Sequence, residues 1–240
     1  MTTTRETLPT IYQRDRWANH FANLQWQQGE HVLISGPTGS GKTTMVRRLI
    51  EKRSHVVVFV SKLYDPTFKN EFKGWTRLEE WPKGGPKPYL NRILLWPRQQ
   101  KTLRDSVSLQ REVFRDAINA ISVQGKRCIV IDESLMMNDP RIIGLGTEIG
   151  LMHYYGRSSG ISMVDLTQRP AWIPNVIYSS VTHAYIAKTR DRNDLKRLSD
   201  MGGVDNREVG LNLMRLPRRQ DYVYLNPLGD APSSVVNTRK

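Results

Sequence analysis

Short apolar runs recur along the chain and alternate with segments in which apolar residues return at helical spacing. Continuous apolar runs are typical of strands in a parallel sheet that is buried on both faces. Apolar residues three or four positions apart predict helices that pack on such a sheet. We expect strands at residues 31–35, 55–61, 92–96, 128–131, 161–167, 181–187 and 222–225, and helices just after residue 42 and over 105–123, 144–159 and 191–199. This order predicts an α/β fold of three layers, with a mainly parallel sheet flanked by helices.

The two ends of the chain are more polar than the central region, 31–226, which we expect to form the main domain. Residues 1–30 are a polar lead-in in which Trp17, Phe21 and Leu24 share one helical face, so we expect this segment to pack on the main domain. Stacking of its tryptophans on nucleic-acid bases is the alternative. Residues 227–240 are rich in Pro, Ser and Asn, and we expect a flexible tail that frays.

Residues 64–90 interrupt the regular pattern. Their Gly and Pro residues are too dense for a long helix or strand. The segment mixes Lys and Arg with Trp and Tyr, a composition typical of loops that contact nucleic acid. A surface insertion with no binding role is the alternative.

The charge of the chain indicates a polyanionic partner. Its 36 basic and 23 acidic residues give a formal net charge of +13, with 240 residues in all. Nucleic acid is the favoured partner, and a generally basic surface is the alternative. The single cysteine, Cys128, excludes an internal disulfide, and no apolar run is long enough to span a membrane. Because the N-terminus lacks the apolar stretch of a signal peptide, we expect a cytosolic protein.

A glycine-rich segment after the first apolar run carries the clearest chemistry. Gly36, Gly41, Lys42 and Thr43 fill every fixed position of the phosphate-binding loop, G-x-x-x-x-G-K-[ST]. Its glycines let backbone N–H groups point at phosphate oxygens, and the helix that follows adds its positive dipole end. Lys42 would reach the β- and γ-phosphates of ATP and the Thr43 hydroxyl would ligate Mg²⁺. The residues expected at the nucleotide are Gly36, Pro37, Thr38, Gly39, Ser40, Gly41, Lys42, Thr43 and Thr44. A chance match in a glycine-rich turn is the alternative.

Two further strand ends are expected at the same edge of the sheet. The run 128–131 ends in Asp132 and Glu133, where Asp132 would hold Mg²⁺ through water and Glu133 would polarise the water that attacks the γ-phosphate. A helix cap at a strand end is the alternative for this pair. Gln168 follows the run 161–167 and is placed to hydrogen-bond the γ-phosphate or the attacking water.

Three segments together resemble the FtsK/HerA superfamily of DNA-pumping ATPases. They are Gly-Pro-Thr-Gly-Ser-Gly-Lys-Thr at 36–43, Ile-Val-Ile-Asp-Glu at 129–133, and the segment 156–170, which ends in Thr-Gln-Arg-Pro. The resemblance implies a P-loop NTPase fold of the RecA/ASCE type, with Glu133 as catalytic base and Gln168 as sensor. Arg157 matches an arginine that is supplied to the neighbouring subunit's nucleotide, which implies a homo-oligomeric ring, a pentamer or hexamer. Pairing of Arg157 with a local carboxylate is the alternative.

A small, single-domain member of that superfamily resembles the genome-packaging ATPases of bacterial viruses. This implies a double-stranded DNA substrate, a viral portal or packaging vertex as partner, no membrane insertion, and a place in the host cytoplasm and with the virion. Candidate DNA contacts are Lys83, Lys87, Arg98, Lys101 and Arg104, which a solvated charged face would equally explain. Alternatives within the superfamily are another DNA-processing ATPase and a filamentous-phage assembly ATPase of the Zot type. Alternatives of other classes are a small-molecule kinase and an ATP-gated DNA-binding assembly module that does not translocate.

Overall fold

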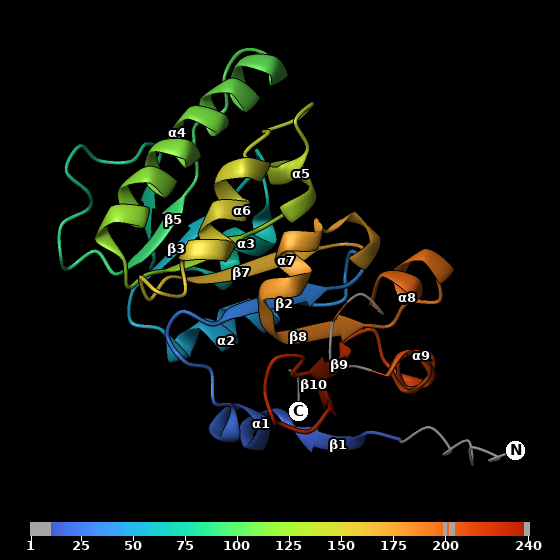
Figure 1. Ribbon diagram of the computed structural model, residues 1–240. Helices are drawn as coiled ribbons and strands as arrows, with labels where there is room; N and C mark the ends of the chain where they lie inside the picture. Colours follow the sequence, from blue (N-terminus) through green and yellow to red (C-terminus); the bar gives the residue numbers. More distant parts are fainter. Residues whose placement is uncertain (1–10, 199–200, 202–204, 238–240) are drawn as a thin grey trace, which may run out of the picture.

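One mixed sheet of ten strands runs through the part of the chain that the structure, a computed structural model, describes: residues 11–198, 201 and 205–237. The strand order is β1-β10-β9-β8-β2-β7-β6-β3-β5-β4 (Figure 1). The strands are β1 (Gln13–Arg16), β2 (His31–Ser35), β3 (Val56–Phe59), β4 (Thr76–Leu78), β5 (Arg92–Leu95), β6 (Cys128–Ile131), β7 (Ser162–Thr167), β8 (Val181–Ala187), β9 (Asp221–Leu225) and β10 (Ser234–Asn237).

The strands from β8 to β4 run parallel, and this brings their carboxyl ends to one edge of the sheet. β9 is antiparallel to both of its neighbours, β8 and β10, and β1 is parallel to β10. The registers are level at the carboxyl edge, where Ser35 of β2 lies opposite Thr167 of β7. Segments that follow β2, β3, β6 and β7 therefore emerge side by side.

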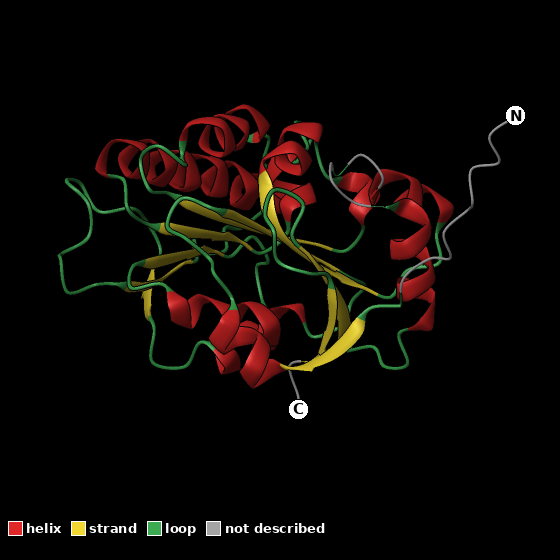
Figure 2. Cartoon of the chain, turned by 60° about the horizontal axis from the view of Figure 1, so that its bottom comes forward, coloured by secondary structure: helices red, strands yellow, loops and turns green. Residues whose placement is uncertain are grey.

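Helices cover both faces of the sheet, as Figure 2 shows with the sheet seen between two helical layers. They are α1 (Trp17–Asn23), α2 (Lys42–Leu49), α3 (Pro66–Glu71), α4 (Leu103–Gln124), α5 (Ser134–Asn138), α6 (Gly146–Tyr155), α7 (Asn175–Ser180), α8 (Arg192–Leu198) and α9 (Asn206–Arg215), with 3₁₀ turns at Ile50–Lys52 and Pro170–Trp172. Alternate strand residues enter two cores. On β3, Val57 and Phe59 pack with α4 and α6, whereas Val56 and Val58 pack with α1, α2 and α3. The α/β three-layer fold expected from the apolar pattern is confirmed.

The long helix α4 illustrates how local sequence sets an element's bounds. Its amino end is capped by Thr102, whose hydroxyl oxygen accepts a hydrogen bond from the Asp105 backbone N–H at 3.0 Å. The helix therefore begins at Leu103, two residues before the start at residue 105 that the sequence predicts. At the other end Gly125 adopts a φ of +68°, which glycine tolerates best, and the helix stops there.

Both ends of the described chain belong to the sheet. The lead-in contributes β1 and α1, and Trp17 and Leu24 are buried against the core, which agrees with the packing expected of them. The tail expected to fray from Pro227 onward is instead ordered over Ser234–Asn237, because β10 pairs with both β9 and β1. Gly202 and Gly203, a pair of glycines that predicts the end of the helix expected over 191–199, lie outside the described residues.

The interruption at 64–90 holds only short elements, α3 and β4, as its composition predicts. Asp65 starts α3, since its side chain accepts hydrogen bonds from the backbone N–H groups of Thr67 and Phe68. Within the described residues, no helix combines the length and the apolar character needed to cross a membrane.

Candidate active site

The phosphate-binding loop lies between β2 and α2, where the sequence places it. Gly39 and Gly41 have φ angles of +80° and +91°, a backbone conformation that favours glycine. Gly36 is needed for a different reason, because a Cβ there would lie 2.6 Å from the Cβ of Ala187 on β8. Ser40 is buried beneath the loop, and its carbonyl accepts a hydrogen bond from the Tyr222 hydroxyl of β9 at 3.0 Å. Gly36 and Ser40 therefore shape the loop from below.

A cleft of about 270 Å³ opens over this loop at the carboxyl edge of the sheet. It gathers segments that follow β2, β3, β6 and β7, as the parallel topology requires. Its lining consists of Thr38, Gly39, Gly41, Lys42, Thr43, Thr44, Lys62, Asp65, Thr67, Asp132, Glu133, Leu166 and Gln168. The structure thus brings together the phosphate loop, the Asp-Glu pair and the glutamine that the sequence predicts at one site.

Lys42 is hydrogen-bonded to the backbone of the phosphate-binding loop. Its ammonium group donates hydrogen bonds to the carbonyl oxygens of Gly36 and Pro37. Burial lowers the pKa of Lys42, and the neighbouring Glu133 carboxylate opposes that effect. The ammonium group is therefore close to both the loop carbonyls and the carboxylates, where phosphate oxygens could replace the carbonyls as acceptors.

Asp132 is a buried carboxylate, 3% exposed, and its Oδ2 has no hydrogen-bond partner among the described residues. Burial raises the pKa of Asp132 to about 7, although the Lys62 ammonium counteracts this. A buried carboxylate oxygen without a partner, in the same cleft as the Thr43 hydroxyl, fits the oxygen ligands that Mg²⁺ prefers. Asp132 and Thr43 are therefore the residues that would hold Mg²⁺, Asp132 through water.

Glu133 and Gln168 form a pair across the cleft. The Gln168 side-chain amide donates to Glu133 Oε2 at 3.1 Å, and Oε1 is buried with no partner in the described part of the chain. Burial raises the pKa of Glu133, against the effects of this hydrogen bond and of Lys42. Glu133 occupies the N-cap position of α5, as the helix-cap alternative expects, but its side chain makes no capping hydrogen bond there. Its free oxygen can orient a water molecule and accept a proton from it.

A buried polar network supports the backbone next to Glu133. The Ser134 hydroxyl donates to Asp165 Oδ1 on β7 at 2.9 Å. The other oxygen of Asp165 lies 2.8 Å from His153 Nε2 on α6, and His153 Nδ1 lies 2.9 Å from the Ser180 hydroxyl of α7. This network ties the start of α5 to β7, α6 and α7, and so fixes where Glu133 leaves β6.

Lys62, for which the sequence gives no functional prediction, is a second cation in this cleft. Its ammonium group lies 2.9 Å from Asp65 Oδ2 and 3.7 Å from Asp132 Oδ1. No short motif marks it. Its position directly after the apolar run 55–61 was the available signal, because β3 pairs with β6 and their carboxyl ends are neighbours.

Arg157 lies away from this cleft, in the turn between α6 and β7. It lines a surface hollow with Gln28, His55, Lys126 and Gly160, which precede strands and so mark the amino edge of the sheet. Gln168 follows the six residues of β7 at the opposite edge, a separation of roughly 20 Å along that strand. The Arg157 side chain is exposed and forms no ion pair in the described structure, so the local-carboxylate alternative is not observed.

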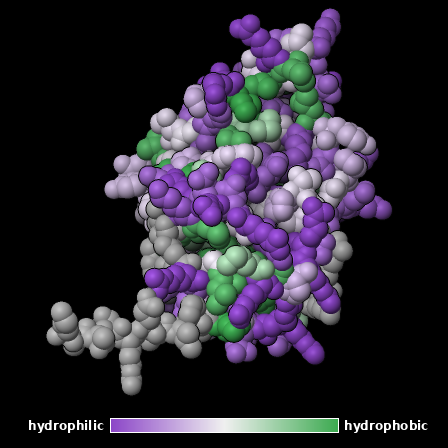
Figure 3. Space-filling view, turned by 90° about the vertical axis from the view of Figure 1, so that its right-hand side faces the viewer, coloured by the Kyte–Doolittle hydropathy of each residue, from purple (hydrophilic) through white to green (hydrophobic). Residues whose placement is uncertain are grey.

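The five candidate DNA contacts are all exposed, but they do not share one environment. Arg98 forms an ion pair with Glu79 at 2.8 Å. Lys83 and Arg98 line a hollow together with four acidic residues, Glu79, Glu80, Glu112 and Asp116. Figure 3 shows the face toward which β2 and β8 point, the face of the cleft, and hydrophilic side chains cover most of it.

No protein-family model and no curated protein matches the chain, but solved structures resemble its backbone. The genome packaging NTPase B204 from Sulfolobus turreted icosahedral virus 2, in complex with AMPPCP, has a TM-score of 0.62 at 12% identity, over 86% of this chain and 96% of that chain. VirB4 of Thermoanaerobacter pseudethanolicus has a TM-score of 0.57 at 11% identity, over 86% and 88% of the two chains. The conjugation coupling protein TcpA of pCW3, with ATPγS, has a TM-score of 0.53 at 14% identity, over 95% and 69%.

The fold is that of a P-loop NTPase. At these identities the likeness concerns the fold, which agrees with the resemblance to FtsK/HerA-type ATPases found in the sequence. The sheet order around β2, β7, β6 and β3 brings the phosphate loop and the Asp-Glu pair into one cleft, as that fold requires.

Proposed function

We propose that this protein is an ATPase that moves double-stranded DNA, as a ring of identical subunits that packages a viral genome in the host cytoplasm. The observation that carries the proposal is the pair of buried carboxylates beside the phosphate loop, each with one oxygen that has no partner among the residues that the structure describes. Buried carboxylate oxygens without a protein partner are expected where a cation or a water molecule binds. The fold shared with a genome packaging NTPase supports the motor part of the proposal.

In the proposed reaction, ATP and water give ADP and phosphate. Lys42 would exchange the Gly36 carbonyl for oxygens of the β- and γ-phosphates. Mg²⁺, held by Thr43 and by Asp132 through water, would supply charge neutralisation for the phosphates. Glu133 Oε1 would orient the attacking water and take up its proton, while Gln168 keeps Oε2 fixed.

Arg157 would complete the site of a neighbouring subunit. It is exposed at the sheet edge opposite its own cleft, so it is available to a cleft on another copy of the chain. An arginine that approaches the γ-phosphate stabilises the charge that develops during transfer. Leu151, Tyr154 and Tyr155 are exposed on α6, directly before Arg157, and give this surface apolar area that a neighbouring subunit could cover.

The proposal is tested by steady-state ATP hydrolysis with and without duplex DNA across a salt series. We expect duplex DNA to stimulate hydrolysis several-fold at low salt, and the stimulation to fade as salt rises because phosphate contacts release counterions. Heparin, a polyanion without a duplex, is the control for charge alone.

Equal hydrolysis with and without DNA at every salt concentration would contradict the motor. ATP consumption that requires a small acceptor would instead indicate the kinase. Binding of ATP and DNA with negligible turnover would indicate the assembly module. These outcomes test separately whether the cleft hydrolyses ATP and whether duplex DNA is the partner.

A further inference from the structure

The turn before β9, residues 217–220, lies against the phosphate-binding loop. A Cβ atom placed on Gly39 would lie 3.9 Å from Arg219 Nη1. A Cβ atom placed on Gly41 would lie 3.7 Å from Gln220 Cγ. Because β9 is antiparallel to β8, it starts at the carboxyl edge of the sheet, where the phosphate loop follows β2. Arg219 and Gln220 are therefore neighbours of the nucleotide site, although no motif marks them.

Hydrogen bonds to Asp221, the first residue of β9, fix the shape of this turn. The Asp221 side chain is fully buried and accepts two hydrogen bonds from the Arg14 guanidinium, at 3.1 and 3.3 Å. It also accepts hydrogen bonds from the Arg218 backbone N–H at 3.3 Å and from the Asn237 side-chain amide. The Asp221 N–H donates to the Arg218 carbonyl at 3.2 Å and closes the turn. The backbone that carries Arg219 is therefore held in one conformation.

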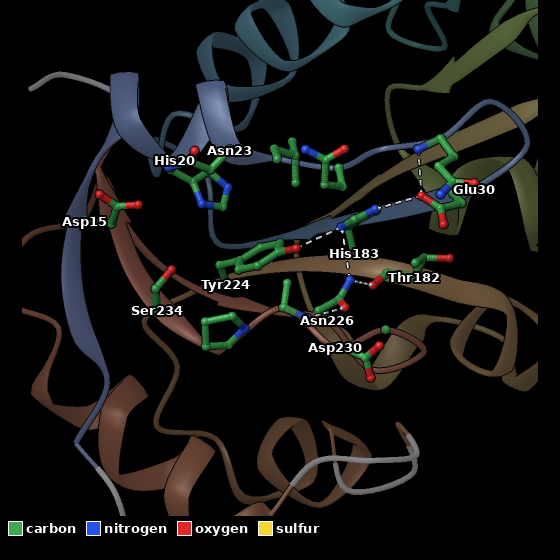
Figure 4. A pocket seen from close by; sticks show the side chains of 16 residues that line it. Asp15, His20, Asn23, Glu30, Thr182, His183, Tyr224, Asn226, Asp230 and Ser234 are labelled. Carbon is green, nitrogen blue, oxygen red and sulfur yellow. Dashed lines mark hydrogen bonds and ion pairs between the residues drawn. The ribbon is translucent and has the colours of Figure 1, made fainter.

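The strand that follows the turn is fixed at both ends. At its start, the Tyr222 hydroxyl is hydrogen-bonded to the phosphate loop. Figure 4 shows the other end, where the Tyr224 hydroxyl lies 2.9 Å from His183 Nδ1 on β8. The Asn226 side-chain amide donates to the Thr182 carbonyl at 2.9 Å in the same view. These contacts hold β9, and the turn before it, in one position relative to β8 and the phosphate loop.

Arg219 brings a positive charge to this position without a carboxylate to neutralise it. Its side chain is exposed and forms no hydrogen bond or ion pair with any residue that the structure describes. Arg169, which follows β7 at the same edge of the sheet, is by contrast paired with Asp191 and Asp194. The Arg219 guanidinium is therefore free to contact a ligand that is bound at the phosphate loop.

The sheet order indicates which end of ATP would meet Arg219. Glu133 and Gln168 reach the cleft from β6 and β7, on one side of β2, whereas β8 and β9 lie on its other side. The γ-phosphate and the nucleoside are at opposite ends of ATP. With the γ-phosphate beside Glu133, the nucleoside extends across the loop toward β9 and the Arg219 side chain.

We propose that Arg219 binds the nucleoside end of ATP, with its guanidinium stacked on the face of the purine base. This inference rests on the proposed binding of ATP in the cleft. A guanidinium is planar and stacks on aromatic rings, which an ammonium group cannot do in the same way. Gln220, half-buried beside Gly41, would close the same side of the site. Because the base does not change in the reaction, this contact would act on nucleotide affinity and not on the chemical step.

The test compares two ligands that share the phosphates and differ in the nucleoside. The full-length protein is titrated calorimetrically with AMPPCP and with tripolyphosphate, each with Mg²⁺ and without DNA. We expect Arg219→Ala to lower AMPPCP affinity by about tenfold, the scale of one stacked cation, and to leave tripolyphosphate affinity unchanged. Arg219→Lys keeps the charge but not the planar group, so most of the loss should remain.

The matched control is Arg104→Ala, which removes an exposed arginine in the first turn of α4. It should bind both ligands as the wild type does, and thermal unfolding shows whether each variant folds. Unchanged AMPPCP affinity in Arg219→Ala would overturn the proposal. An equal loss for AMPPCP and tripolyphosphate, or full recovery in Arg219→Lys, would also overturn it, because either result assigns Arg219 to the phosphates.

Steady-state hydrolysis supplies a second readout. Arg219→Ala should raise KM for ATP about tenfold and change kcat by less than about twofold. A lower kcat at unchanged KM would contradict a role at the nucleoside. These results are separate from the motor proposal, since wild-type hydrolysis that ignores DNA would contradict the motor and leave the Arg219 comparison intact. Wild-type protein that binds neither AMPPCP nor tripolyphosphate would instead overturn the nucleotide site itself, and the role of Arg219 with it.

Discussion

At the residue scale, the proposed reaction depends most on two adjacent carboxylates. Asp132 and Glu133 are both buried, and burial raises the pKa of each. Lys62 and Lys42 lie close enough to oppose that effect, but Asp132 keeps a pKa of about 7. Ionisation of these two carboxyl groups in the cleft therefore costs free energy, and a cation bound next to them would lower that cost.

The substitution Asp132→Asn tests whether ionisation of Asp132 destabilises the folded protein. The native pKa of Asp132 is raised above its ordinary value of 3.8, so its contribution to stability is complete below about pH 4 and is lost as pH rises through about 7. Asparagine cannot ionise, and we expect the metal-free variant to exceed the wild type in free energy of unfolding at pH 8 by roughly 1–4 kcal/mol, at about 1.4 kcal/mol per pKa unit.

Urea unfolding at pH 5 and pH 8 in the presence of EDTA measures this difference. The advantage of the variant should grow between the two pH values and should reverse when ATP and Mg²⁺ are added, because the variant lacks the carboxylate expected to help hold the metal. A difference in free energy that is the same at both pH values would show that Asp132 does not titrate in this range.

At the scale of elements, the sequence predicts the central strands and not the edges of the sheet. The sequence predicts β8 over the same residues that form it, because five of its seven residues are apolar. β1 reads Gln-Arg-Asp-Arg and is mostly exposed, so no local pattern marks it. It forms because Gln13 lies opposite Ser234, a partner more than 200 residues away, and the same pairing orders the expected tail.

The candidate site shows the same division. Fixed spacing in the phosphate loop and the Asp-Glu pair made it predictable that Lys42, Thr43, Asp132 and Glu133 line one cleft. Lys62 reaches the cleft only through the pairing of β3 with β6, which no motif records.

At the scale of the whole molecule, the sheet separates Arg157 from its own nucleotide cleft and so makes assembly part of the proposed mechanism. Mixing two inactive variants tests this. Arg157→Ala keeps an intact cleft, and Lys42→Ala keeps an intact arginine. In a ring mixed at random from equal amounts, roughly a quarter of the junctions join the intact cleft to the intact arginine, so comparable activity should return.

ATP hydrolysis before and after subunit exchange measures the recovery. The separate variants, assayed at the same total concentration, are the controls. A mixture no more active than the mean of the two separate variants would leave Arg157 without a role in a neighbouring site.

The central claim is that Glu133 activates water for ATP hydrolysis in the cleft at the carboxyl edge of the sheet. It is tested most directly by the substitution Glu133→Gln, with ATP binding and single-turnover hydrolysis measured on the same preparation. We expect ATP binding to change little and hydrolysis to fall by about 10²–10⁴-fold, the usual contribution of a positioned general base. Hydrolysis at the wild-type rate in the Glu133→Gln protein would contradict the account.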